Sequence, residues 1–256
     1  ECTQANAKTK PSPTSDSPSS TEMLQILHTD FMGPIPTTYD GRNYVMTVMD
    51  DFSKLASVVT MKSKDEAPAY LIHICNQLEN QTGLKIKAIR SDNGGEYINA
   101  AVAKFTTGKG IDPQQSAPYM PQSNGSAENL NFKLQAKTTA MLLMAKIEPN
   151  VWSEGIKTAA YMRNRSPHSA TPGNQTPYGI FKKQIPSVKH FKVFGSPCYA
   201  VLPSHQRKKF GAKSIKGQFV GYELASKSYR VYYAETNQVR VQRDVATSMM
   251  QLYSPP

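Results

Sequence analysis

The sequence has few cysteines and no long apolar run. Its three cysteines, Cys2, Cys75 and Cys198, lie far apart and form no CxxC pair, which argues against a disulfide framework and a complete zinc site. A membrane span needs about 18 consecutive apolar residues, and no stretch of this chain approaches that length. We therefore expect a protein of a reducing compartment with no membrane partner.

Acidic residues are also scarce. Asp and Glu number 19 against 30 Lys and Arg, which gives a formal net charge of +11. A surface that binds polyanions typically has this balance, although a solvated basic surface has it too. Charge alone therefore favours nucleic acid as a partner only slightly. The 39% of hydrophobic residues over 256 positions is enough to bury a core.

Composition divides the chain into four parts. Residues 1–22 are rich in Thr, Ser and Pro, as a linker is. Residues 23–166 alternate strand-like and helical patterns, and residues 167–190 form a connector. Residues 191–256 hold short β-rich runs at 194–202, 215–222, 228–234 and 238–245, which predict a separate small β-rich module.

The order of elements within residues 23–166 predicts an α/β fold. Strand-like runs cover 23–31, 44–49 and 55–61, and a helical period over 64–81 stops at Gly83. A strand at 86–91, a helix at 97–107, a strand at 111–116, a long helix at 123–146 and a last helix at 152–164 follow. This order predicts the mixed sheet, flanked by helices, of an RNase H-like domain.

Three carboxylates fall where such a fold can bring them together. Asp30 ends the first strand, Asp92 follows a later strand, and Glu128 lies in the first turns of the long helix, with 61 and 35 residues between them. Strand ends meet at one edge of a sheet, where a neighbouring helix can add a third carboxylate. Carboxylate oxygens suit Mg²⁺ or Mn²⁺, and two such ions would activate a water or a DNA 3′-hydroxyl and stabilise the leaving oxygen. Taken singly, an aspartate at a strand end is more often a turn former or an ion-pair partner.

Three motifs contain these carboxylates, and a fourth lies between the first two of them. They are His28–Pro34 (HTDFMGP), Met49–Lys54 (MDDFSK), Ile89–Tyr97 (IRSDNGGEY) and Tyr119–Asn129 (YMPQSNGSAEN). Together they resemble the integrases of copia-type retrotransposons, within the retroviral integrase superfamily. The likeness continues through Ala159–Pro167, Thr176–Tyr178, Phe194–Cys198, Phe219–Tyr222 and Arg243–Val245, so it covers nearly the whole chain.

The resemblance implies a function and a site. Asp30, Asp92 and Glu128 would be the catalytic residues and the ligands of two Mg²⁺ or Mn²⁺ ions. The implied enzyme trims the 3′ ends of element cDNA and joins them to host DNA, as a homo-oligomer that holds two ends. Asp50 and Asp51 would have a capping or turn role, and Glu96 would be a helix N-terminal acid.

The resemblance also bears on zinc and on location. The family's zinc domain uses two histidines and two cysteines, of which only Cys2 could be the last, so residues 1–22 hold at most its remnant and no zinc is predicted. The function implies the nucleus, with cytoplasmic element particles before entry. The long basic tail that carries nuclear localisation in such proteins is missing, so no targeting segment supports that location.

Two sets of residues are candidates for DNA contact. Near Glu128 they are Gln122 and Asn124 in the loop before the long helix, and Asn129, Lys133 and Lys137 at i, i+4 and i+8 on that helix. Loop flexibility and a solvated lysine face explain the same residues, whereas Leu130, Leu134, Met141 and Leu142 are expected to pack. In the β-rich module the candidates are Arg207–Lys209, Lys213 and Lys216 with Tyr222, Tyr229, Tyr232 and Tyr233, although tyrosines in strands are more often sheet or core residues.

Two departures from the family favour a second hypothesis. Members usually carry a basic residue directly after the glutamate and another three positions on, whereas this chain has Asn129 and Phe132 there. A decayed or repurposed copy that binds DNA or assembles without catalysis would show such losses. A third hypothesis, a nuclease that only hydrolyses, shares the same site.

Overall fold

A five-stranded mixed sheet forms the first part of the computed structural model, which describes residues 20–91, 100–115, 125–202, 207 and 209–247. Its strands are β1 (Ile26–Met32), β2 (Tyr44–Asp50), β3 (Ala56–Met61), β4 (Ala88–Ser91) and β5 (Asp112–Gln115). They lie in the order β3-β2-β1-β4-β5. The first three strands pair antiparallel, whereas β1 with β4 and β4 with β5 pair parallel. The predicted RNase H-like sheet is confirmed.

The helices agree closely with the helical periods of the sequence. They are α1 (Ala67–Thr82), α2 (Ala100–Lys109), α3 (Gly125–Ala145), α4 (Trp152–Asn164) and α5 (Pro177–Lys182). Gly83 ends α1 at a φ of 73°, the left-handed conformation that glycine adopts without a steric penalty. The predicted start at Lys64 is a short 3-10 turn, Lys64–Glu66, capped by Ser63. α5 lies within residues 167–190, for which only a connector was predicted.

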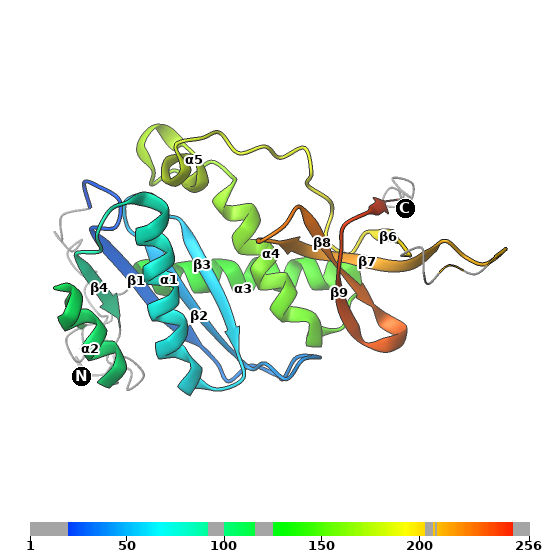
Figure 1. The fold of residues 1–256 in the computed structure, drawn as a ribbon, viewed down its shortest axis with the longest axis horizontal. Coiled ribbons are helices and arrows are strands. Elements are labelled where there is room, and N and C mark those ends of the chain that lie inside the picture. Colours follow the sequence, from blue (N-terminus) through cyan, green and yellow to red (C-terminus); the bar gives the residue numbers. More distant parts are fainter. Residues whose placement is uncertain (1–19, 92–99, 116–124, 203–206, 208, 248–256) are drawn as a thin grey trace, which may run out of the picture.

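The two faces of this sheet pack against different helices. Along β2, Met46 and Val48 lie in a cluster with α1, whereas Val45 and Met49 lie in a cluster with α3 and α4, because successive side chains of a strand point to opposite faces. Figure 1 shows α1 across one face of the sheet and α3 behind the other. The α3 face is the one that carries the candidate site.

A second sheet follows. Its strands are β6 (Pro197–Val201), β7 (Ser214–Glu223), β8 (Ser228–Tyr233), β9 (Gln238–Gln242) and β10 (Val245–Thr247), in the order β10-β6-β7-β8-β9 and antiparallel throughout. This confirms the β-rich module. The single run predicted at 238–245 is wrong in detail, because β9 ends at Gln242, the chain bends at Arg243 and Asp244, and Val245 already begins β10 on the opposite edge of the sheet.

The second sheet rests on α4 rather than standing apart. Val220 of β7 and Tyr232 of β8 share a hydrophobic cluster with Ile156 and Ala159 of α4. The hydroxyl of Thr158 donates to the carbonyl oxygen of Val220 at 2.8 Å. α4 therefore joins the two sheets into one packed body (Figure 1).

A buried ion pair reinforces this junction. The side chain of Glu154 on α4 is fully buried and accepts hydrogen bonds from Arg230 of β8, one of them at 3.0 Å, and from Tyr39 at 2.9 Å. Burial alone would raise the pKa of Glu154, but the hydrogen bond from Arg230 and the charge of Lys157 outweigh it and hold that pKa below its usual range. Glu154 is therefore ionised at neutral pH.

No helix in the described ranges has both the length and the apolar character needed to cross a lipid bilayer.

Candidate functional site

Asp30 lies near the end of β1 on the face covered by α3. It pairs across the β1–β2 ladder with Thr47, so the two side chains share this face. Asp30 is only 9% exposed. Its Oδ1 accepts the backbone N–H of Phe31 at 2.8 Å, which fixes the direction of the carboxylate.

Asn131 of α3 connects this strand pair to the helix. Its Nδ2 donates to Oδ2 of Asp30 at 2.9 Å, and its Oδ1 accepts the hydroxyl of Thr47 at 2.8 Å. Because the amide is buried and both ends are occupied, its orientation is fixed by the two strand residues. Asn131 thereby ties α3 to the Asp30 carboxylate.

Glu128 lies in the first turn of α3 and is exposed. It precedes Asn131 by three positions, and residues three apart on a helix are neighbours on its surface. The structure therefore brings the helical turn of Glu128 to the strand end of Asp30. Both side chains offer hard oxygen donors.

Asp92, Gln122 and Asn124, three of the predicted site residues, lie outside the described residues. So does Glu96. In the described ranges, no group of three His, Cys, Asp or Glu side chains is placed to hold a metal ion. The chain reaches Asp92 directly after Ser91, the last residue of β4, and β4 is the parallel neighbour of β1.

The predicted stripe on α3 is on the surface. Asn129, Lys133 and Lys137 are all exposed, and so is Phe132 at 71%. The predicted packing residues behave as expected, since Leu130, Leu134 and Leu142 are buried and Met141 is half-buried against them.

Positive charge extends from this stripe to neighbouring elements. Burial lowers the pKa of the His168 imidazole, and nearby cations lower it further, namely Arg163, Lys133, Lys54 and Lys137. The α3 lysines, the end of α4 and the β2–β3 turn therefore contribute to one positive electrostatic field at His168.

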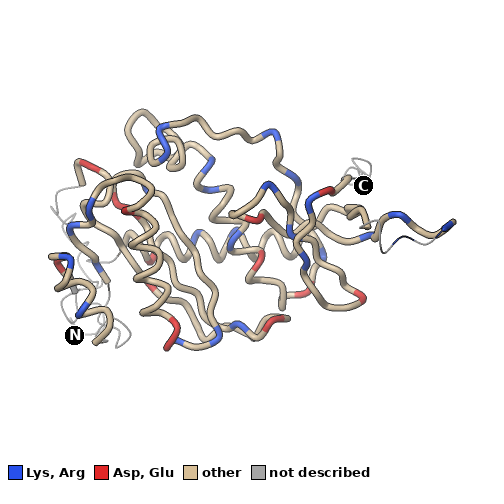
Figure 2. Tube along the Cα trace, in the orientation of Figure 1, with Lys and Arg blue, Asp and Glu red and all other residues tan. Residues whose placement is uncertain are grey.

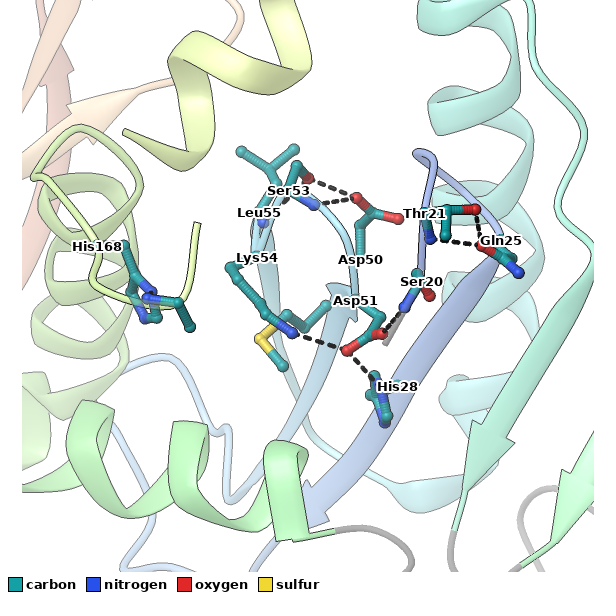
Figure 3. Close-up of polar contacts among 12 residues, drawn as sticks. Ser20, Thr21, Gln25, His28, Asp50, Asp51, Ser53, Lys54, Leu55 and His168 are labelled. Carbon is teal, nitrogen blue, oxygen red and sulfur yellow. Dashed lines mark hydrogen bonds and ion pairs between the residues drawn. The ribbon is translucent and has the colours of Figure 1, made fainter. Parts of the chain in front are cut away.

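Asp50 and Asp51 hold the β2–β3 turn, as predicted. Asp50 accepts the backbone N–H groups of Leu24 and Ser53 at 2.7 and 2.8 Å. Asp51 accepts Lys54 Nζ at 2.7 Å and lies 3.2 Å from Nε2 of His28 (Figure 3). Both carboxylates have structural partners, which confirms the turn role.

The tyrosines of the β-rich module are sheet and core residues. Tyr222, Tyr232 and Tyr233 are buried and Tyr229 is half-buried, so the structural alternative is confirmed for three of them. Arg207, Lys209, Lys213 and Lys216 are exposed, and Lys208 lies outside the described residues.

The thiols that the structure describes are unsuited to nucleophilic chemistry. Cys75 and Cys198 are free and buried. Burial raises the pKa of Cys75 to about 12 and that of Cys198 to about 11, so both stay protonated at neutral pH.

Asn131 and Thr47 were not among the residues that the sequence suggested. The one local signal was a polar residue between Leu130 and Leu134, on the buried side of a helix whose glutamate lies three positions earlier. Buried polar groups usually have partners, but the partner could not be read from the sequence.

Two family models match the chain. The model described as "Integrase core domain" matches residues 20–121, and the model described as "Retroviral polymerase SH3-like domain" matches residues 196–252. The matches cover the first sheet and the β-rich module respectively.

Curated relatives come from plant transposons. The chain is 34% identical over 224 residues to the retrovirus-related Pol polyprotein from transposon TNT 1-94 of Nicotiana tabacum. It is 27% identical over 228 residues to the corresponding polyprotein from transposon RE1 of Arabidopsis thaliana. These alignments cover 87% and 88% of this chain but only 17% and 15% of the relatives, so the chain spans about a sixth of their length.

A solved structure shares the fold. It is a chain of the simian T-cell lymphotropic virus intasome in complex with PP2A regulatory subunit B56 gamma, with a TM-score of 0.51 and 17% identity over 86% of this chain and 76% of that one. The fold, both family models and the plant relatives all point to the same family. The chain belongs to the integrases of copia-type retrotransposon Pol polyproteins, with an integrase core followed by a retroviral SH3-like domain.

Proposed function

We propose that this chain catalyses the processing of 3′ ends of element cDNA and their transfer into host DNA, dependent on Mg²⁺ or Mn²⁺. The observation that carries the proposal is the Asn131–Asp30 hydrogen bond, which brings the helical turn of Glu128 to the strand end of Asp30. Family membership supports the reaction class.

The residues fit hard divalent cations. Asp30 and Glu128 contribute carboxylate oxygens, which are the ligands that Mg²⁺ and Mn²⁺ prefer. Asp92, next to the end of β4, is the proposed third ligand. Two such ions held there would supply Lewis-acid activation of a water or a 3′-hydroxyl and stabilisation of the leaving oxygen.

The chain's own residues supply position and charge. Asn131 and the Phe31 amide orient the Asp30 carboxylate. Lys133 and Lys137 project from the exposed side of the same helix, where they would contact phosphates and fix register without reading sequence. Element cDNA and target DNA are thus the proposed partners, with two or more copies holding two ends and the nucleus as the place of action.

The test compares carboxylate variants of the purified protein. Asp30→Asn, Asp92→Asn and Glu128→Gln should each abolish Mn²⁺-dependent joining of a labelled duplex end. Each should also weaken Mn²⁺ binding measured by calorimetry. Asp112→Asn, an exposed carboxylate on β5 of the same sheet, is the matched control and should retain both.

The outcomes separate the competing functions. Joining that is equal in wild type and Asp92→Asn would refute the proposal. Cleavage without joining would assign a hydrolytic nuclease. Salt-dependent DNA binding with no metal-dependent chemistry would assign the non-catalytic module that Asn129 and the exposed Phe132 favour.

A further inference from the structure

A cavity of about 780 Å³ lies between the end of α4, the segment around α5 and the β7–β8 hairpin. Its lining includes Arg165, Tyr178, Lys189, Lys227 and Tyr229. The lining includes none of Asp30, Glu128 and Asn131, although Tyr222 and Tyr229 of the β-rich module belong to it. The cavity is large enough for a ligand of one or two nucleotides, since pockets of about 300–1,000 Å³ hold most small ligands.

Two tyrosine rings contact Arg165 in this cavity. Its guanidinium carbon lies 3.5 Å from the centre of the Tyr161 ring and 4.3 Å from the centre of the Tyr178 ring. Tyr161 in turn stacks on Tyr222 at 4.3 Å, and its hydroxyl lies 2.7 Å from Nε2 of His190. One guanidinium N–H donates to the carbonyl oxygen of Tyr161 at 3.3 Å. A guanidinium has five N–H donors, and those that remain match the oxygens of a phosphate.

The positive charge of the cavity is not cancelled by its own lining. In the described part of the chain, no carboxylate lies within ion-pair distance of Arg165. Glu223 lines the cavity, but its carboxylate forms an ion pair with the guanidinium of Arg230 at 3.0 Å. Lys189 and Lys227 add two exposed ammonium groups. Figure 2 shows further basic residues along the connector that leads from α5 towards β6.

The lining also exposes apolar side chains. Ile185 is 91% exposed and Leu224 is 82% exposed, and both line the cavity. Apolar surface beside an anion-binding arginine is suited to a ligand that has a flat apolar part and a phosphate.

We propose that this cavity binds single-stranded nucleic acid, with a phosphodiester on the edge of Arg165 and a base against Ile185, Leu224 and the ring of Tyr229. Stacking on aromatic side chains combined with basic phosphate contacts is the usual means of binding single strands without sequence preference. An acidic or phosphorylated peptide also carries an anionic group that Arg165 could bind, so it is the competing occupant. The site goes beyond the proposed function, because binding here requires no chemistry at Asp30.

The experiment uses the whole chain and a photoreactive oligonucleotide. A 12-mer of thymidine with 4-thiothymidine at one position is irradiated with the protein, and crosslinked peptides are identified by mass spectrometry. We expect crosslinks within residues 178–190 or 222–229. Asp30→Asn should crosslink as wild type does, so failure here and failure of the catalytic proposal are distinguishable.

Two variants measure the contribution of charge. Arg165→Gln should weaken binding of the oligonucleotide about tenfold, because it removes a charged donor. Arg240→Gln is the matched control: Arg240 is an exposed arginine of the same module, with its guanidinium carbon 5.6 Å from the Tyr233 ring centre. It should bind as wild type does.

Lys189→Gln combined with Lys227→Gln changes only exposed side chains and keeps the test valid if Arg165→Gln unfolds. A plot of log affinity against log salt concentration has a negative slope, and each single-strand phosphate that a lysine neutralises adds about 0.7 to its magnitude. Loss of two lysine contacts should therefore make the slope of the double variant shallower by about 1.4. The proposal is overturned if all crosslinks map elsewhere, or if the double variant keeps the wild-type salt slope. It is also overturned if a phosphorylated peptide binds in an Arg165-dependent way while the oligonucleotide does not crosslink.

Discussion

The side-chain amide of Asn131 donates to Oδ2 of Asp30 over 2.9 Å, although 101 positions separate the two residues in the chain. The same amide accepts the hydroxyl of Thr47, which lies opposite Asp30 on β2. One residue of α3 thus sets both the direction of a candidate metal ligand and the position of the helix that carries another.

Replacement of Asn131 by alanine should therefore weaken metal binding more than it disturbs the fold. Removal of a group that orients a metal ligand typically lowers metal affinity about 10–100-fold, and calorimetric titration with Mn²⁺ measures it. Thr47→Val is the comparison, since it leaves the Asn131–Asp30 bond in place and should have the smaller effect. Equal Mn²⁺ affinity in Asn131→Ala and wild type would contradict a positioning role.

Phe132→Lys should restore a phosphate-binding cation that the family usually has. Phe132 is 71% exposed, so the change should leave stability nearly unaltered, and one further phosphate neutralised on duplex DNA should steepen the salt slope of binding by about 0.9. Leu143→Lys adds the same charge at a 73% exposed position farther along α3. If Phe132→Lys and Leu143→Lys increase the affinity for DNA by the same factor, the added charge rather than its position explains the effect.

Glu154→Gln should loosen the junction between α4 and the second sheet. Removing one partner of a buried ion pair costs about 3–5 kcal/mol, and urea unfolding at neutral pH measures it. Glu235→Gln, an exposed glutamate of the same module, should cost almost nothing.

The effect of Glu154 should depend on pH in a defined direction. Its pKa in the folded protein lies below the ordinary value of 4.5, so the ionised group stabilises the fold above that value. This stabilisation is lost as the pH falls through the lowered pKa. The stability difference between wild type and Glu154→Gln should therefore be largest at neutral pH and shrink below about pH 4.5; a difference that grows on acidification would contradict the assignment.

Gly195→Ala should be strongly destabilising because the backbone and the neighbouring helix both oppose a side chain. Gly195 has a φ of +80°, and an added Cβ would lie 2.1 Å from Cβ of Ala145 in α3. Gly83→Ala is the control, since its φ is +73° but nothing lies within 4 Å. We expect about 1–2 kcal/mol for the left-handed backbone alone and about 1–3 kcal/mol more at Gly195 for the clash. Thermal or urea unfolding of the two variants tests this, and equal losses of stability would show that the backbone conformation is sufficient.

The sequence determined the order and type of the elements in this chain. The helix over 152–164 was predicted with the bounds that α4 has, and the three opening strands were placed within a few residues. Alternation and helical period are local properties of neighbouring residues, so they can be read without tertiary information. The positions of Asp30 and Glu128, at a strand end and in the first turns of a helix, were likewise fixed by local pattern.

Only the tertiary structure decided which distant residues meet. Nothing local connects Asn131 to Asp30, Glu154 to Arg230, or Arg165 to Tyr178, because each contact depends on how whole elements pack. The run predicted at 238–245 forms β9 and ends at the first residue of β10, and these two strands lie on opposite edges of one sheet, since pairing depends on the partner strand as well as on the strand's own sequence. The sequence specified the elements through short-range periodicity, whereas the site geometry, the α4 junction and the Arg165 cavity arise from long-range packing and hydrogen bonding.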